Sequence, residues 1–227
     1  MIGIIGAMEA EVKEIRDLMT ETSLEEYRSI PFVKGKLSGK DVILMQSGVG
    51  KVLAAMSTTV LLEHYDIDFV INIGTAGGLL VEQEVLDAVF ATKIGQFDKR
   101  FGPTHTPSYD DEVVTVVCDP DLVSKARECF AAPENKVWIG PMVTSDQFVY
   151  NQQQLKVIEE FFPGALCADM ESGAIGAVCT FYHKPFVVLR SLSDIAVKEG
   201  NELTFMDYLP KASKRSAKWA KEFLSKL

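Results

Sequence analysis

Short apolar runs recur along the chain, and several of them are apolar at successive positions rather than at alternating ones. Strands with this pattern are covered on both faces, as in sheets that carry helices on each side. Longer stretches of helical periodicity separate the runs, which predicts an α/β domain with a layered, largely parallel or mixed sheet. The predicted strands are 2–5, 42–46, 69–73, 88–92, 113–117, 165–168 and 186–189, and the predicted helices are 9–19, 52–65, 121–130, 152–161, 172–182 and 205–224.

Length and composition limit the class of protein. With 227 residues, of which 47% are hydrophobic and 24% charged, the chain has a globular composition and is expected to form one domain spanning 1–227. A net charge of −9 argues against a nucleic-acid partner, which requires a basic face. The cysteines show no metal-ligand spacing, and no apolar segment reaches the roughly 18 residues of a membrane span. We therefore expect a cytoplasmic protein without a metal site, a nucleic-acid partner or a membrane partner.

The first predicted strand is followed by a Gly-Ala-Met turn and an acidic helix start. Gly6 alone does not make the GxGxxG fingerprint of a dinucleotide site. Glu9 and Glu11 would compete with an anion for the positive end of the helix dipole. Both are also common stabilisers of a helix start, and the local pattern by itself favours that role.

Two other predicted strands end in carboxylates. Glu171 follows 165–168, and Asp194 follows 186–189 in a Ser-x-Asp pattern that is also common in turn caps. Because ligands of open α/β sheets collect beyond the carboxyl ends of strands, Glu11, Glu171 and Asp194 are expected at one edge of the sheet. Carboxylates without metal-binding histidines indicate acid/base work on a neutral or cationic centre, and hydrolysis of a glycosidic bond is such a reaction.

Six motifs follow one another along the chain: GIIGAMEAEV, SGVGK, INIGTAGG, TSDQFV, ADMESGAI and VVLRSLSD. In their order and approximate spacing they resemble those of bacterial 5′-methylthioadenosine/S-adenosylhomocysteine nucleosidases, which belong to the nucleoside phosphorylase superfamily. The resemblance implies a three-layer α/β/α fold with a central twisted mixed β-sheet, and a homodimer whose partner subunit lines the pocket for the 5′ substituent. It also implies hydrolysis of the N9–C1′ bond of adenine nucleosides that carry a 5′-thio group, without a metal or cofactor.

The resemblance also implies roles for individual residues. Asp194 would be the general acid that protonates adenine N7, Glu11 would activate the attacking water, and Glu171 would hold the ribose hydroxyls. Phe148 would stack on adenine, and Phe205 would either close over the sugar or serve only helix packing. The other implied substrate contacts are Met8, Val49, Thr75, Ala76, Gly77, Val149, Met170 and Ser193.

The sequence departs from the family pattern at several positions. Thr75 stands where the family usually has Ser, Asp169 stands where it has Glu, and a second acid after Asp194 is missing. The largest departure is the irregular segment 93–111, which in the family helps to shape the pocket for the 5′ substituent. His105 in this segment is either a solvated loop residue or a contact to that substituent in the partner subunit. The sequence therefore does not determine which 5′ substituent the protein prefers.

Three other functions compete with this interpretation. A phosphorylase would need Arg or His donors for phosphate near the first turn, where the sequence instead has Glu9 and Glu11. A hydrolase of another nucleoside, such as a futalosine derivative, could retain the same acids. A silent nucleoside-binding protein would be expected to lack one of Glu11, Glu171 and Asp194, and all three are present. The sequence therefore favours catalysis.

Overall fold

The structure, a computed structural model, describes residues 1–102, 104–131, 136–198 and 201–227, with the backbone alone for 201–204. Its strands are β1 (Ile2–Gly6), β2 (Thr20–Tyr27), β3 (Ile30–Leu37), β4 (Lys40–Gln46), β5 (Phe69–Gly78), β6 (Ala88–Gln96), β7 (Thr115–Val117), β8 (Val137–Thr144), β9 (Cys167–Asp169) and β10 (Phe186–Ile195). Its helices are α1 (Glu9–Arg16), α2 (Lys51–His64), α3 (Pro120–Cys129), α4 (Gln152–Phe161), α5 (Ser172–Phe181) and α6 (Asn201–Lys226).

The strands form one mixed sheet in the order β10-β6-β8-β9-β5-β1-β4-β3-β2, with β7 paired to β6. β4, β1, β5 and β10 are joined by parallel pairings. Since β5 pairs with both β10 and β9, the strands β5, β10, β6, β8 and β9 close a ring, and β1 to β4 extend from it. This arrangement aims the carboxyl ends of β1, β5 and β10 at the same edge of the sheet.

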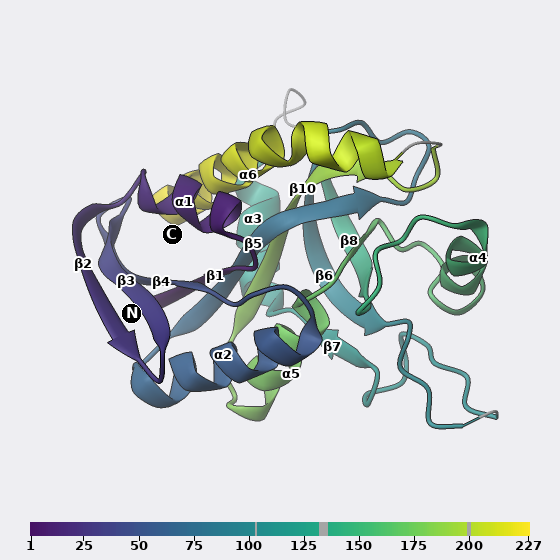
Figure 1. Cartoon of the computed structure of the whole chain (residues 1–227), viewed down its shortest axis with the longest axis horizontal. Coiled ribbons are helices and arrows are strands. Elements are labelled where there is room, and N and C mark those ends of the chain that lie inside the picture. Colours follow the sequence, from purple (N-terminus) through teal and green to yellow (C-terminus); the bar gives the residue numbers. More distant parts are fainter. Residues whose placement is uncertain (103, 132–135, 199–200) are drawn as a thin grey trace.

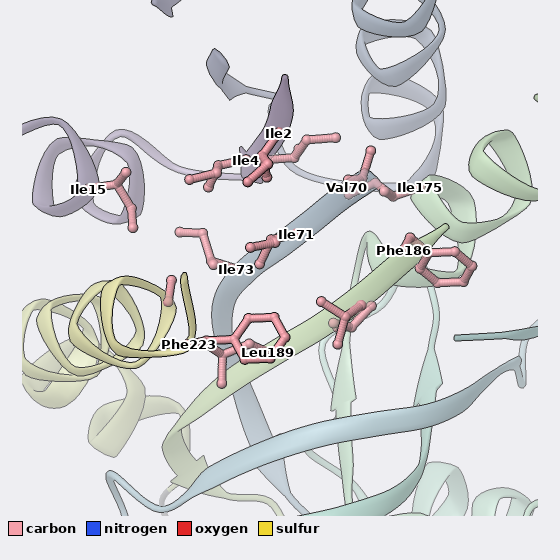
Figure 2. Close-up of a cluster of buried hydrophobic side chains, with 14 of the residues drawn as sticks. Ile2, Ile4, Ile15, Val70, Ile71, Ile73, Ile175, Phe186, Leu189 and Phe223 are labelled. Carbon is pink, nitrogen blue, oxygen red and sulfur yellow. The ribbon is translucent and has the colours of Figure 1, made fainter. Parts of the chain in front are cut away.

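Helices cover both sides of the sheet (Figure 1). α1 and α6 pack together on one side, where α6 contacts β5 and β10, while α2 and α5 pack together on the other. The buried core joins Ile4 and Ile71 of the sheet to Ile15 on α1, Phe223 on α6 and Ile175 on α5 (Figure 2). The predicted fold class, a mixed sheet with helices on both sides, is confirmed.

Three strands were not predicted from the sequence. The side chains of β2, an edge strand with the sequence TETSLEEY, are exposed or half-buried, so no buried face marks the strand. β3 and β8 carry Gly and Pro, which lower the strand signal. β6 continues to Gln96, so the irregular part of the segment 93–111 begins only at Phe97. α6 begins at Asn201 rather than at 205, and α1 ends at Arg16 rather than at 19.

Within the described ranges, no helix is both long enough and apolar enough to cross a bilayer.

Gly173 provides a test of the packing of α5 on the sheet. A Cβ at this position would lie 2.3 Å from Thr144 Cγ2 on β8. We expect Gly173→Ala to lower the free energy of unfolding by roughly 1–3 kcal/mol, the usual cost of overpacking. Gly3→Ala is the control, because the nearest atom to its Cβ would be Leu61 Cδ2, at 3.2 Å. Urea unfolding measures both variants, and equal stability of the two would contradict the packing described.

Candidate active site

One cavity of about 280 Å³ lies beyond the carboxyl ends of β1, β5, β9 and β10. All of the substrate-contact and catalytic residues named from the sequence line it: Met8, Glu11, Val49, Thr75, Ala76, Gly77, Phe148, Val149, Met170, Glu171, Ser193, Asp194 and Phe205. Four further residues also line it, although no role was predicted for them from the sequence: Ala7, Gln147, Ala168 and Asp169. Each of the four lies within one of the six motifs, and this position in the sequence could have marked them as cavity residues. The structure brings the residues together, while their roles remain predictions.

Glu11 is held at the junction of α1 and β5. Its Oε2 accepts hydrogen bonds from the backbone N–H groups of Ala7 (2.9 Å) and Met8 (3.1 Å), and so stabilises the start of α1. Its Oε1 accepts from Thr75, both from the backbone N–H (2.9 Å) and from the hydroxyl (3.2 Å). Glu11 therefore serves as a helix cap and as a cavity residue at once. Glu9, by contrast, is an exposed residue paired with Arg16.

The environment of Glu11 affects its protonation in two opposing ways. Burial raises the pKa of this carboxyl above its usual value, against the opposing effects of the Arg190 charge and of the backbone donors. A carboxylate with a raised pKa is a better proton acceptor near neutral pH than an ordinary surface glutamate.

The contact between Glu11 and Thr75 also requires a glycine in β5, because a Cβ on Gly74 would lie 2.9 Å from Glu11 Oε1.

Asp194 is fully buried, and an irregularity of β10 turns it toward the cavity. In the pairing with β5, Leu192 lies opposite Ala76 and Asp194 lies opposite Gly77, so one extra residue, Ser193, is inserted. In a regular strand neighbouring side chains point to opposite faces, whereas here both Ser193 and Asp194 line the cavity. The Ser193 hydroxyl donates to Asp194 Oδ1 over 2.9 Å. Gly77 leaves room for the carboxyl, since a Cβ there would lie 3.0 Å from Asp194 Oδ2.

Glu171 lies at the start of α5 and accepts a hydrogen bond from the backbone N–H of Gly50 over 2.8 Å. Burial, and then the neighbouring negative charge of Asp169, raise the pKa of Glu171 to about 8. The backbone N–H of Gly50 and the charge of Arg190 lower the pKa but do not offset these two effects.

Behind the cavity wall, Arg190 forms a buried ion pair with Asp169. Arg190 Nη2 also donates to Asn72 Oδ1 (2.6 Å), and Nη1 donates to Asn72 O (3.2 Å). Arg190 itself is not among the residues that line the cavity. Its guanidinium is nevertheless the positive charge that faces the buried carboxylates of Glu11, Asp169 and Glu171.

Two aromatic rings border the cavity. Phe148 and Phe205 meet edge to face, with ring centroids 5.6 Å apart. The backbone at Phe148 is fixed by Gln154, whose Nε2 donates to Phe148 O over 2.9 Å. An aromatic pair in this position provides the apolar, stackable surface that a purine base requires.

His105 and His64 both lie outside the cavity, and only His105 was considered as a substrate contact from the sequence. His105 lies 2.8 Å from Asp111 Oδ2 and meets the ring of Phe101 edge to face. His64 stacks on Tyr27 and contacts Glu25, so it joins α2 to the β2 edge. Among the described residues, no group of three or more His, Cys, Asp and Glu side chains could hold a metal ion.

Comparison with known proteins decides the family. The sequence model of the phosphorylase superfamily matches residues 1–225. The chain belongs to this superfamily.

Among its superfamily relatives, a 5′-methylthioadenosine/S-adenosylhomocysteine nucleosidase of Bacillus thuringiensis is 37% identical over 236 residues, covering 100% of this chain and 99% of the relative. The crystal structure of the Neisseria meningitidis nucleosidase in complex with methylthio-immucillin-A has a TM-score of 0.89 and 29% identity, over 100% and 99% of the two chains. The futalosine hydrolase of Helicobacter pylori has a TM-score of 0.92 and 27% identity, over 100% and 97%. The predicted class, a nucleosidase of the phosphorylase superfamily, is confirmed.

The raised pKa of Glu171 predicts a pH-dependent stability. Folding moves this pKa from 4.5 to about 8, so between these values the folded protein binds more protons than the unfolded chain. The free energy of unfolding then falls as the pH rises through this interval. We expect Glu171→Gln to reduce that slope. The substitution retains a side-chain acceptor for the backbone N–H of Gly50. Urea unfolding at several pH values from 5 to 8 measures the slope. Exposed Glu160→Gln is the control, and identical slopes in the two variants would contradict the assignment.

Proposed function

We propose that this protein hydrolyses the N-glycosidic bond of 5′-methylthioadenosine and S-adenosylhomocysteine, releasing adenine and the 5′-thioribose product. The observation that carries the proposal is the convergence of Glu11, Glu171 and Asp194 on one cavity bordered by Phe148 and Phe205. The nucleosidase names and ligand complexes of the relatives support the substrate class. Hydrolysis of such an adenine nucleoside requires an acid that protonates the leaving base, a water molecule that attacks C1′ and contacts that hold the sugar.

Asp194 is the proposed general acid. Cleavage of the N9–C1′ bond leaves negative charge on the purine, and protonation at N7 makes the base a better leaving group. The buried position of Asp194 and the Ser193 hydroxyl bond keep its carboxyl oriented toward the cavity. The backbone of Val149 and the Thr75–Gly77 segment would border the base, and Phe148 would stack on it.

Glu11 is the proposed activator of the attacking water. The lining residues in the described part of the chain include no Arg, Lys or His, the side chains that would bind a phosphate nucleophile. A phosphate ion would instead meet the carboxylate of Glu11. The electrostatics of the cavity therefore favour attack by water over attack by phosphate.

Glu171 is the proposed ribose ligand, together with Met170. The ionised form of Glu171, whose share grows as the pH rises toward the pKa of about 8, accepts hydrogen bonds from both ribose hydroxyls, and its negative charge favours the cationic sugar of an oxocarbenium-like transition state. Phe205, which meets Phe148 edge to face at the cavity, would cover the ribose and exclude bulk water. Met8 and Val49 would complete the wall on the side of the 5′ substituent.

A second candidate substrate is a futalosine-type nucleoside. The structural similarity to a futalosine hydrolase, with a TM-score of 0.92, favours its inclusion in the assay. The test measures, by chromatography, the release of free purine base from 5′-methylthioadenosine, S-adenosylhomocysteine and futalosine. We expect adenine from the first two at rates far above that of the third. Faster turnover of futalosine would reassign the substrate, and no turnover of any would overturn the proposed function.

We further propose that two copies associate through α2 and α5. These helices expose a group of apolar side chains that includes Val52, Leu53, Met56 and Phe181. Val49, which is 49% exposed, connects this face to the cavity, so a partner seated there would reach the wall for the 5′ substituent. No cofactor enters this proposal.

Asp194→Asn tests the general acid. The amide retains the size and one acceptor of the carboxyl but carries no acidic proton, so we expect kcat to fall by roughly 10²–10⁴-fold. Thermal unfolding checks that the fold is intact, and Asp110→Asn on an exposed loop is the matched control. Near-normal turnover of Asp194→Asn would contradict its assigned role.

Met56→Glu tests the association surface. A charge in the centre of an apolar interface opposes burial, so we expect this variant to sediment as a monomer at concentrations where the parent protein is a dimer. Leu24→Glu on the β2 edge, where Leu24 is 75% exposed, is the control for an added surface charge. Unchanged sedimentation of Met56→Glu would place the dimer contact elsewhere.

A further inference from the structure

Two charged residues beside the cavity have no part in the proposed chemistry. Lys51 ends the SGVGK motif and opens α2, and Asp98 lies just after β6 in the divergent segment 93–111. The structure brings both of them together with Asp146, which lies in the TSDQFV motif after β8.

The three residues close a cycle of hydrogen bonds. Lys51 Nζ donates to Asp98 Oδ1 over 2.7 Å. Asp98 Oδ2 accepts from the backbone N–H of Asp146 over 2.9 Å. Asp146 Oδ1 in turn accepts from the backbone N–H of Lys51 over 2.7 Å. The side chains of Asp98 and Asp146 thus each accept a hydrogen bond from a backbone N–H group of another segment. The cycle therefore fixes the backbone of these segments as well as their side chains.

Two of the joined segments lead directly into walls of the cavity. Gly50, next to Lys51, donates its N–H to Glu171, the proposed ribose ligand. Gln147 and Phe148 follow Asp146, and Phe148 is the proposed stacking residue. Gly50 has φ = 91°, a left-handed conformation that favours glycine and allows this tight passage beside Asp146.

Two of the three side chains in the cycle, those of Lys51 and Asp98, are partly buried, whereas that of Asp146 is 50% exposed. The side chains of Lys51 and Asp98 are 17% and 24% exposed, whereas in the surface pair Lys13–Asp17 both are more than half exposed. Solvent screens exposed pairs until they contribute little, and charge-assisted bonds that are shielded from water retain more of their strength. Asp146 also places its negative charge at the N-terminus of α2, where the helix dipole favours it.

We propose that Lys51, Asp98 and Asp146 form a clamp that sets the separation between the ribose-binding and base-stacking sides of the cavity. This inference rests on the proposed function for its substrate. The three are positioning residues, because none of them lines the cavity at the proposed reacting atoms, and Glu11 and Asp194 are held by other contacts. Through Asp98, the divergent segment acts on substrate binding without itself touching the base or the ribose.

The experiment compares Asp98→Ala and Asp98→Asn with Asp110→Ala. Asp110 is an exposed acid of the same segment whose side chain has no role in the clamp, so its removal controls for lost charge. Asp98→Asn keeps one acceptor oxygen of the side chain and loses the other together with the negative charge. Steady-state kinetics with 5′-methylthioadenosine give kcat and KM, and hydrogen–deuterium exchange of the ligand-free protein follows the segments 47–51 and 145–149.

We expect Asp98→Ala, which removes both hydrogen bonds that Asp98 accepts in the clamp, to raise KM about tenfold, with kcat within about threefold of the parent value. Asp98→Asn should give a smaller rise in KM, and Asp110→Ala none. Exchange at both segments should be faster in Asp98→Ala than in the parent protein, faster to a smaller extent in Asp98→Asn, and unchanged in Asp110→Ala. Equal KM and equal exchange in Asp98→Ala and Asp110→Ala would overturn the clamp, as would a loss of kcat alone.

The exchange measurement separates failure of the clamp from failure of the proposed function. If the parent protein releases no adenine, the substrate assignment fails, and unchanged exchange in Asp98→Ala still decides against the clamp. If Asp98→Ala does not fold, the same comparison is made with Asp98→Asn, whose shape matches that of the parent residue. No change in that variant would also overturn the inference.

Discussion

The site depends on the burial of several carboxylates around one guanidinium. Glu11, Asp169, Glu171 and Asp194 are all buried, and Arg190 is the buried cation behind them. Removing charges from water is costly unless they are paired, hydrogen-bonded or protonated. Asp169 is paired with Arg190, Glu11 receives its hydrogen bonds from β5 and the start of α1, and Glu171 holds its proton to a higher pH. The carboxyls thus reach different protonation behaviour within one cavity, as acid/base chemistry requires.

The backbone makes this concentration of charge possible. Parallel pairing of β1, β5 and β10 brings their carboxyl ends to one edge, and the extra residue in β10 turns Ser193 and Asp194 to the same side. Gly74 and Gly77 in β5 leave the space in which the carboxyls of Glu11 and Asp194 approach the strand. The proposed clamp acts on the same cavity from outside, by joining segments that the sheet does not connect.

Much of this site follows from sequence, and the remainder has identifiable physical causes. The rule that ligands meet strand ends placed Glu11, Glu171 and Asp194 together, and the motif resemblance supplied the surrounding residues. The inserted residue in β10 depends on its register against β5, which no local pattern records. The Arg190–Asp169 pair and the Lys51–Asp98 contact join residues 21 and 47 positions apart, so they emerge only when the sheet is assembled. β2 was missed because an exposed edge strand has no buried face to mark it.

The buried carboxylates are proposed to direct water, and not phosphate, to the sugar carbon. The decisive measurement is the rate of adenine release from 5′-methylthioadenosine in phosphate-free buffer and in buffer with added phosphate. Attack by water predicts equal rates in both buffers, with a free reducing sugar as the second product. Release that requires phosphate and yields a phosphorylated sugar would contradict it, and would remove the role proposed for Glu11.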